Sequence, residues 1–404
     1  MRLSPSLGPL FAAIVALAAV GTTGCGSSSD EPAAEAVPPN PFQEVVDRGL
    51  GKYVGKAKVV ATDATSQPGV VTYEFDPASG PRCLSGDPYR MSVRDRGSDD
   101  LFLFLQGGGA CWSTYCLAIT KAPPGIPKLD VLDPDKPTNP MRDLTTVYLP
   151  YCDGSMFAGD AESDSDHDGK IDRWQHGLQN LSAAIDVAYA AKAAPRRVVL
   201  AGSSGGGYGT ILAALLVRTR WPSAELLVID DAGIGLGKPG DASFIDAIVD
   251  ELAIRPLLPA SCPDCTANGH ITRMVAWELA HDPKLRISAF SSYGDQVISD
   301  VFLGSDAATF EQALRAETGA LHDATPDRYR RFFVKGRMHT TLLGTIDGII
   351  GTDFTAVKLP PGAAAKLAGL QIGSIDGTMV GGVSVATWVG AMLRGEPAWD
   401  DRLE

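Results

Sequence analysis

The sequence predicts an α/β fold in which helices flank a mostly parallel central sheet. Short, continuous apolar runs recur along the chain, and amphipathic stretches separate them. Continuous apolar runs are typical of strands buried on both faces, and strands that alternate with helices form parallel βαβ units. The expected strands are residues 70–75, 90–94, 101–105, 146–149, 197–201, 225–229, 287–291 and 331–334. The expected helices are residues 174–192, 207–219, 271–281, 307–317 and 384–393.

The composition is that of a globular protein with a sizeable core. The chain has 404 residues, of which 45% are hydrophobic and 21% are charged. Its net charge of -13 argues against nucleic acid as a partner, because phosphate binding needs a basic surface. The same charge argues against an anionic membrane surface as the substrate. We find no internal repeat, and we expect one domain over residues 43–404 and a monomer.

The N-terminus has the features of an export signal. Arg2 precedes a short apolar run over residues 10–20, which is too short to span a membrane. The segment 21–25 ends in Cys25 and resembles a bacterial lipobox, although the usual Leu is absent three residues before the Cys. We expect a signal peptide over residues 1–24, then a lipidated Cys25 and a flexible tether over residues 25–42. The protein would face outward from a bacterial membrane, held by the lipid alone, or be secreted.

Six cysteines remain once Cys25 is assigned to the lipid. An even number in an exported chain predicts disulfides, but six cysteines allow 15 pairings, and the sequence alone does not choose among them. The C-x-x-C pair at 262–265 could be a local disulfide or half of a zinc site. A second pair is missing, so a local disulfide is favoured there. The six are Cys83, Cys111, Cys116, Cys152, Cys262 and Cys265.

A G-x-S-x-G motif centred on Ser204 carries the predicted chemistry. An apolar strand precedes the motif and a stretch compatible with a helix follows it, which is the context of the nucleophile elbow of α/β-hydrolases. Its glycines allow a sharp turn. A Walker loop is excluded because no Lys-Ser or Lys-Thr follows the glycines, and the spacing is wrong for G-x-G-x-x-G. Ser204, and not the neighbouring Ser203, is therefore the expected nucleophile.

The base and the acid follow from chain order, which in this fold is Ser, then Asp or Glu, then His. His339 lies on a loop just after the last expected strand of the domain, and we assign it as the base. Asp295 follows the strand 287–291 and is the expected acid. The pair Asp230 and Asp231 after the strand 225–229 is the runner-up, and Asp300, expected inside the following helix, is a third candidate.

Two backbone N–H groups are expected to form the oxyanion hole. One would come from Gly205, the residue after the nucleophile. The other would come from the glycine-rich segment 107–110 that follows the strand 101–105, with Gly108 or Gly109 as the donor. An ordinary flexible loop is the alternative interpretation of that segment.

An acidic segment over residues 164–172 resembles a calcium loop. Oxygens at alternate positions can converge on one hard cation, and Gly169 allows the turn. The twelfth position is Gln175 and not Glu, so a complete EF-hand is not expected. A structural calcium ion and a solvated acidic loop both fit the pattern. The candidate ligands are Asp164, Asp166, Asp168 and Asp172.

Four segments together resemble the pectin acetylesterase and Notum family of carboxylesterases. They are Cys83–Tyr89, Gly107–Trp112, Tyr151–Asp160 and Gly202–Gly206. The third, Y-C-D-G-S-M-F-A-G-D, is the most specific, since a generic hydrolase does not require it. Ala110 is an insertion relative to the family's G-G-G-W-C loop, and Trp112 and Cys111 are exchanged in order. The first segment also departs from the family, at Ser85 and Asp87.

The resemblance implies a Ser-Asp-His esterase with no metal in catalysis. It supports Asp295, whose Y-G-D-Q context is similar to the family's Y-D-x-x-Q region. It also implies three disulfides: Cys83 with Cys152, Cys111 with Cys116, and Cys262 with Cys265. The substrate does not carry over, because family members act on acetylated pectin or on a lipid ester of a protein.

We therefore expect a serine carboxylesterase that removes an acetyl or longer acyl group from a carbohydrate, such as an acetylated glycan, or from another extracytoplasmic ester. Two other functions compete with this one. The first is a depolymerase or peptidase that uses the same triad, and the second is a non-catalytic, carbohydrate-binding relative. The presence of a serine, an aspartate and a histidine in the required order argues against the second.

Overall fold

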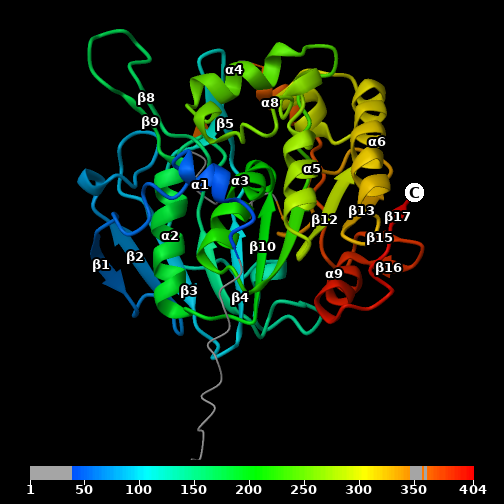
Figure 1. Cartoon of the computed structure of the whole chain (residues 1–404), viewed down its shortest axis with the longest axis horizontal. Coiled ribbons are helices and arrows are strands. Elements are labelled where there is room, and N and C mark those ends of the chain that lie inside the picture. The colour runs from blue at the N-terminus through cyan, green and yellow to red at the C-terminus, as the bar shows by residue number, and fades with distance from the viewer. Residues whose placement is uncertain (1–38, 346–356, 359–361) are drawn as a thin grey trace, which may run out of the picture. The chain divides into compact units, whose positions relative to one another are not determined.

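A ten-stranded sheet runs through the centre of the computed structural model, which describes residues 39–345, 357–358 and 362–404 (Figure 1). The strand order is β1-β2-β3-β7-β4-β10-β11-β12-β13-β17. From β7 through β17 every neighbouring pair is parallel, whereas β1, β2, β3 and β7 pair antiparallel. The sheet is therefore mostly parallel, as the alternating pattern predicts. Its strands are β1 (Val59–Asp63), β2 (Val71–Phe75), β3 (Arg90–Arg94), β4 (Asp100–Leu105), β7 (Thr145–Leu149), β10 (Arg197–Ser203), β11 (Glu225–Asp231), β12 (Leu285–Ser292), β13 (Tyr329–Val334) and β17 (Arg402–Leu403).

Helices cover both faces of this sheet. The longer ones are α2 (Gly177–Ala191), α3 (Gly205–Arg220), α4 (Ser243–Glu251), α5 (Thr272–His281), α6 (Ala307–Ala324) and α9 (Val385–Arg394). Two short helices are α1 (Gln43–Asp47) and α8 (Ala363–Lys366), and a π-helix, η5, spans Val297–Leu303. No helix among the described residues has the length and apolar character that a membrane crossing needs.

Strand β4 shows why the core has two layers. Successive side chains of a strand point to opposite faces of the sheet. Leu101, Leu103 and Leu105 pack with the apolar faces of α2, α3, α5 and α6. Phe102 and Phe104 point the other way and pack with α9. All six residues of β4 are buried, which accounts for the continuous apolar run in the sequence.

Several small elements were not expected from the sequence. The segment expected as a glycine loop continues into a hairpin of β5 (Gly109–Trp112) and β6 (Tyr115–Ile119), which β14 (Val357–Lys358) extends. A second hairpin, β8 (Ala161–Ser163) and β9 (Arg173–Gln175), carries the acidic loop away from the sheet (Figure 1). A third pairs β15 (Met379–Val380) with β16 (Val383–Ser384).

Residues Pro38–Glu404 form one compact unit. The expected signal peptide and Cys25 lie outside the described residues, as does nearly all of the expected tether. The first described helix, α1, begins at Gln43.

Candidate active site

Ser204 lies at the turn between β10 and α3. The strand ends at Ser203 and the helix begins at Gly205, so Ser204 alone connects them. Its φ is 56° and its ψ is -121°, a combination that residues with a Cβ rarely adopt. Its N–H donates to the carbonyl oxygen of Asp231 at 2.8 Å, which keeps the residue in register with β11. This is the strained conformation of a nucleophile elbow, with the serine at the positive end of a helix.

The glycines around Ser204 are required by close backbone approaches. A Cβ on Gly202 would meet the carbonyl oxygen of Gly206, and a Cβ on Gly206 would meet that of Leu105. Both obstacles are backbone atoms of the elbow or of the neighbouring strand, so they cannot rotate away as a side chain could. The motif's glycines are therefore explained by packing, and the backbone strain falls on Ser204.

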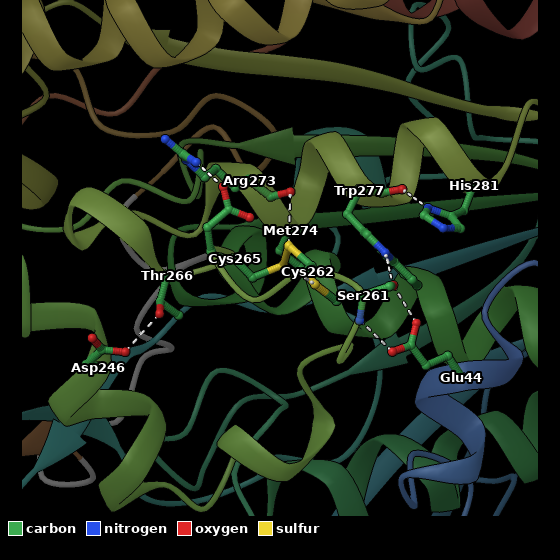
Figure 2. Close-up of a disulfide and its surroundings, with 11 residues drawn as sticks. Glu44, Asp246, Ser261, Cys262, Cys265, Thr266, Arg273, Met274, Trp277 and His281 are labelled. Carbon is green, nitrogen blue, oxygen red and sulfur yellow. Dashed lines mark hydrogen bonds and ion pairs between the residues drawn. A yellow bond between two sulfur atoms is a disulfide. The ribbon is translucent and has the colours of Figure 1, made fainter.

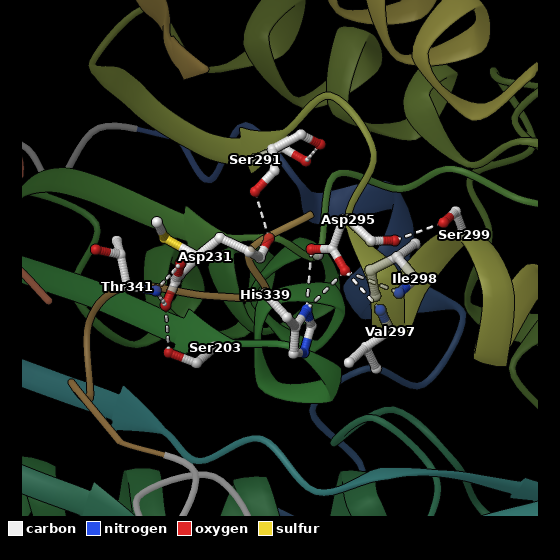
Figure 3. A network of polar contacts seen from close by, with 12 residues as sticks. Ser203, Asp231, Ser291, Asp295, Val297, Ile298, Ser299, His339 and Thr341 are labelled. Carbon is white, nitrogen blue, oxygen red and sulfur yellow. Dashed lines mark hydrogen bonds and ion pairs between the residues drawn. The ribbon is translucent and has the colours of Figure 1, made fainter. Parts of the chain in front are cut away.

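Asp295 and His339 form a buried hydrogen-bonded pair (Figure 3). Asp295 follows β12 and His339 follows β13, the next strand in the sheet. The Nδ1 atom of His339 lies 2.9 Å from Oδ2 and 3.0 Å from Oδ1 of Asp295. The Oδ1 atom also accepts the N–H groups of Val297 at 3.0 Å and Ile298 at 2.9 Å. These donors at the start of η5 fix the orientation of the carboxylate.

The other ring nitrogen of His339, Nε2, is buried and has no hydrogen-bond partner among the described residues. When Nδ1 donates its proton to a carboxylate, Nε2 is the nitrogen that carries the lone pair. The imidazole is therefore held in the tautomer that a general base needs. Ser204 is 4% exposed and His339 is 1% exposed, so both lie beneath the surface.

The remaining histidines make other contacts. His176 binds the carbonyl oxygen of Gly80 through Nδ1 at 2.6 Å and Glu162 through Nε2 at 3.0 Å. The Nδ1 atoms of His281 and His322 contact main-chain carbonyls at 2.8 and 3.0 Å. Among the described residues, His339 is the histidine that binds the Asp295 carboxylate.

The alternative acids are placed differently from Asp295. Asp300 lies inside η5, as expected, and its carboxylate pairs with Arg337. Asp230 is buried and accepts the Gly233 N–H at 2.7 Å. Burial raises the pKa of Asp230 to about 7, with a further contribution from the neighbouring Asp231. Asp231 binds the backbone of the loop that carries His339 and not its imidazole.

The glycine segment before β5 lies against the start of α3. A Cβ on Gly205 would lie 2.6 Å from the carbonyl oxygen of Gly109. Gly109 has a φ of +84°, and its Cβ would meet the backbone of Leu117 in β6. Gly108 uses its carbonyl oxygen to accept the Ile119 N–H at 2.9 Å. Of the two candidates in this segment, Gly109 is the one whose backbone lies beside Gly205.

The structure contains three disulfides with the pairing that the family resemblance implies. They join Cys83 to Cys152, Cys111 to Cys116 and Cys262 to Cys265. The second closes the β5–β6 hairpin, directly after the glycine segment. The third shows that the C-x-x-C pair forms a disulfide and not half of a zinc site.

The Cys262–Cys265 loop is fastened from two sides (Figure 2). Ser261 donates its N–H to Glu44 of α1 at 2.7 Å and accepts the indole N–H of Trp277 of α5 at 2.9 Å. The loop therefore ties the first helix of the described chain to α5, which is a structural role.

The acidic loop brings three of its four expected ligands together. Carboxylate oxygens of Asp164, Asp166 and Asp168 lie within 4.8 Å of one another. Asp172 is not part of this group, and its carboxylate accepts the Ser165 N–H at 2.8 Å. Gln175, at the twelfth position, donates to the carbonyl oxygen of Cys111. The three aspartates could hold a cation, and the fourth expected ligand has another partner.

An aromatic cluster that sequence reasoning missed lies around the start of α3. Tyr208, one turn after Ser204, packs on Phe302 of η5 at a centroid distance of 5.4 Å. Phe302 in turn contacts Trp112 of β5 at 5.6 Å and Phe244 of α4 at 5.8 Å. The segments that meet here are far apart in the sequence, and no periodicity connects them, so the sequence carried no signal for the cluster.

A cavity of about 60 Å³ lies beside this cluster. Its thirteen lining residues are apolar or aromatic, and they come from α3, α4, α5, η5 and neighbouring loops. Both α3 and η5 begin within two residues of a candidate catalytic residue, Ser204 and Asp295 respectively. The lining residues are Met156, Ala158, Tyr208, Ile211, Leu212, Ile245, Ile248, Val249, Ile254, Leu258, Ile271, Met274 and Phe302.

The sheet, its flanking helices and the strand-to-helix turn at Ser204 define an α/β-hydrolase-like protein. The family model described as pectinacetylesterase matches residues 66–240. This match confirms the resemblance carried by the four motifs, and over residues 66–240 the chain is similar to the pectin acetylesterase family. The match supports an esterase of that type, a carboxylic ester hydrolase. Asp295 and His339 lie beyond the matched segment. A search of curated proteins found no match.

Proposed function

We propose that the protein is a serine carboxylesterase that uses Ser204, His339 and Asp295. The observation that carries the proposal is the Asp295–His339 pair, which leaves a buried imidazole nitrogen free in a fold with a strained serine at its elbow. His339 Nε2 takes the proton of Ser204 as its Oγ attacks the ester carbonyl carbon. The bond to the alcohol oxygen then breaks, and the imidazolium returns the proton to the departing alcohol.

Water completes the reaction by the same steps. His339 takes a proton from water, whose oxygen attacks the acyl carbon, and the bond to Ser204 Oγ breaks with return of the proton to the serine. Asp295 holds the imidazole and stabilises its positive charge. The N–H groups of Gly205 and of Gly109 or Gly108 stabilise the oxyanion. No metal or cofactor is part of these steps.

The apolar cavity supports an acyl group longer than acetyl as the group that is removed. It offers contacts to hydrocarbon and no charged side chain, and it is built on the two elements that begin next to Ser204 and Asp295. The alcohol is proposed to be a carbohydrate or another extracytoplasmic partner. The three disulfides are consistent with export, and anchoring through Cys25 remains part of the proposal.

A series of p-nitrophenyl esters from acetate to decanoate tests this function, together with acetylated glycans, a polyester and peptides. We expect ester hydrolysis that is lost in Ser204→Ala, with kcat/KM rising beyond acetate. Hydrolysis of peptides or polyester at a higher kcat/KM would favour the depolymerase or peptidase. Binding of glycans without any turnover would favour the non-catalytic relative.

A further inference from the structure

Asp231 contacts the backbone on both sides of the proposed site (Figure 3). It is the last residue of β11 and is fully buried. Its carbonyl oxygen accepts the N–H of Ser204 at 2.8 Å, and its Oδ2 accepts the hydroxyl of Ser203 at 2.7 Å. Its carboxylate also accepts the Thr341 N–H at 2.9 and 3.0 Å and the Leu342 N–H at 3.0 Å. One residue thus joins the end of β10 to the loop after β13.

The loop that Asp231 binds carries His339 next to a strained residue. Thr340 is buried and has a φ of 58°, which β-branched residues rarely adopt. On the other side of the loop, His339 donates its N–H to Gln371 at 2.9 Å, and Thr340 accepts the Gly373 N–H at 3.0 Å. Strain of this kind costs roughly 1–3 kcal/mol and persists only where surrounding contacts outweigh it. The contacts of Asp231 are among those that hold this conformation.

We infer that Asp231 is a positioning residue, whose carboxylate sets the separation of His339 from Ser204 by binding the Ser203 hydroxyl on one side and the backbone of the His339 loop on the other. The inference rests on the proposed function. It divides the orientation of the base between two aspartates: Asp295 binds the imidazole, and Asp231 binds the main chain two and three residues beyond it. It also explains why the sequence pattern fits two acids, one at the end of β11 and one after β12.

The charge of Asp231 strengthens this link. Burial raises the pKa of Asp231 to about 6, although the Leu342 N–H, the Ser203 hydroxyl and the charge of His339 act in the opposite direction. Above that pH the carboxylate is ionised, and hydrogen bonds to an ionised acceptor are roughly twice as strong as neutral ones. An amide in its place is neutral, and its NH2 group would face the Thr341 N–H that Oδ1 now accepts, so the link is weakened.

The test compares wild type, Asp231→Asn and Asp230→Asn as purified full-length proteins. We expect Asp231→Asn to lower kcat on p-nitrophenyl ester by about 10²-fold, because a displacement of about 1 Å costs that much. KM should stay within about threefold, and the rate of fluorophosphonate labelling of Ser204 should fall in parallel with kcat. Asp230→Asn is the matched control, because Asp230 is the buried neighbour that binds Gly233. It should keep kcat within about threefold.

A folded Asp231→Asn protein with kcat near that of wild type would overturn the inference, even if its melting temperature is lower. If this variant does not fold, amide hydrogen exchange in wild type decides. The Thr341 and Leu342 amides should exchange as slowly as those of β11, and rapid exchange would show that the carboxylate does not hold the loop. A wild-type protein whose Ser204 is not labelled refutes the proposed function instead, so the two failures are distinguishable.

Discussion

Replacement of Asp295 by asparagine should disable His339 by inverting its tautomer. The Oδ1 atom of Asp295 accepts the N–H groups of Val297 and Ile298, at 3.0 and 2.9 Å. An asparagine would keep its oxygen there, because its NH2 group cannot accept these donors. The NH2 group would then take the place of Oδ2, which lies 2.9 Å from His339 Nδ1. It would donate to Nδ1, and the ring proton would move to Nε2, where the base needs a lone pair.

The expected loss follows from that change of tautomer. An inverted tautomer in a Ser-His-Asp triad lowers kcat by on the order of 10⁴-fold. That factor corresponds to about 5 kcal/mol of transition-state stabilisation. KM for a p-nitrophenyl ester should change much less, because the substitution is isosteric and lies behind the imidazole.

The assay measures steady-state kinetics of Asp295→Asn and Asp300→Asn, and a thermal melt of each variant checks that it is folded. Asp300→Asn is the control, because Asp300 lies five residues further on, in η5, and pairs with Arg337. It should keep kcat within about threefold. The reasoning is refuted if Asp295→Asn retains more than about a tenth of the wild-type kcat while Asp300→Asn loses it.

Four further predictions follow from the same structure. Gly205→Ala should lower kcat about 10²-fold with little change in KM. The new Cβ would lie 2.6 Å from the carbonyl oxygen of Gly109 and displace an oxyanion donor. Unchanged turnover would place the oxyanion hole elsewhere. Burial raises the pKa of Asp230 from 3.8 to about 7, so the folded state binds the carboxyl proton more tightly than the unfolded state does. The stability that this bound proton contributes is lost as the pH rises through the folded-state pKa. The melting temperature should therefore fall between pH 5 and pH 8, and less so in Asp230→Asn; a wild-type melting temperature that rises over this range would contradict the prediction. Removal of the Cys83–Cys152 disulfide, whose sequence separation is 69, should lower the unfolding free energy by about 4 kcal/mol in a denaturant titration. A loss below about 1 kcal/mol would show that the disulfide does not constrain the unfolded chain. Calcium should raise the melting temperature through the 164–168 loop, and equal melting in calcium and in chelator would leave that loop without a cation.

The central strands were predictable because they are buried on both faces. β4 and β11 appear in the sequence as continuous apolar runs, and their bounds differ from the expected ones by at most two residues. The elbow was predictable for a related reason, since close backbone approaches admit only glycine at Gly202 and Gly206. Asp295 and His339 could be selected because parallel strands end at the same edge of a sheet, which brings consecutive loops together.

The hairpin after β4 could not be predicted from residue pattern. Its strands are four and five residues long and are joined at Ser113–Thr114, without the Gly or Asn that mark most tight turns. The role of Asp231 was hidden for another reason. An aspartate after a strand has the same local pattern whether it binds an imidazole or a backbone, and its partners are 110 and 111 residues away. Pairing of the six cysteines likewise came only with the family resemblance.

Fluorophosphonate labelling followed by peptide mass spectrometry tests the central claim most directly. The probe should modify wild-type protein on Ser204 alone and abolish ester hydrolysis in proportion to the label incorporated. Ser204→Ala should take up no label and show no hydrolysis, whereas Ser203→Ala, whose change lies one residue away, should still be labelled on Ser204. Label on any other residue, or ester hydrolysis that persists in Ser204→Ala, would contradict the assignment of Ser204 as the nucleophile.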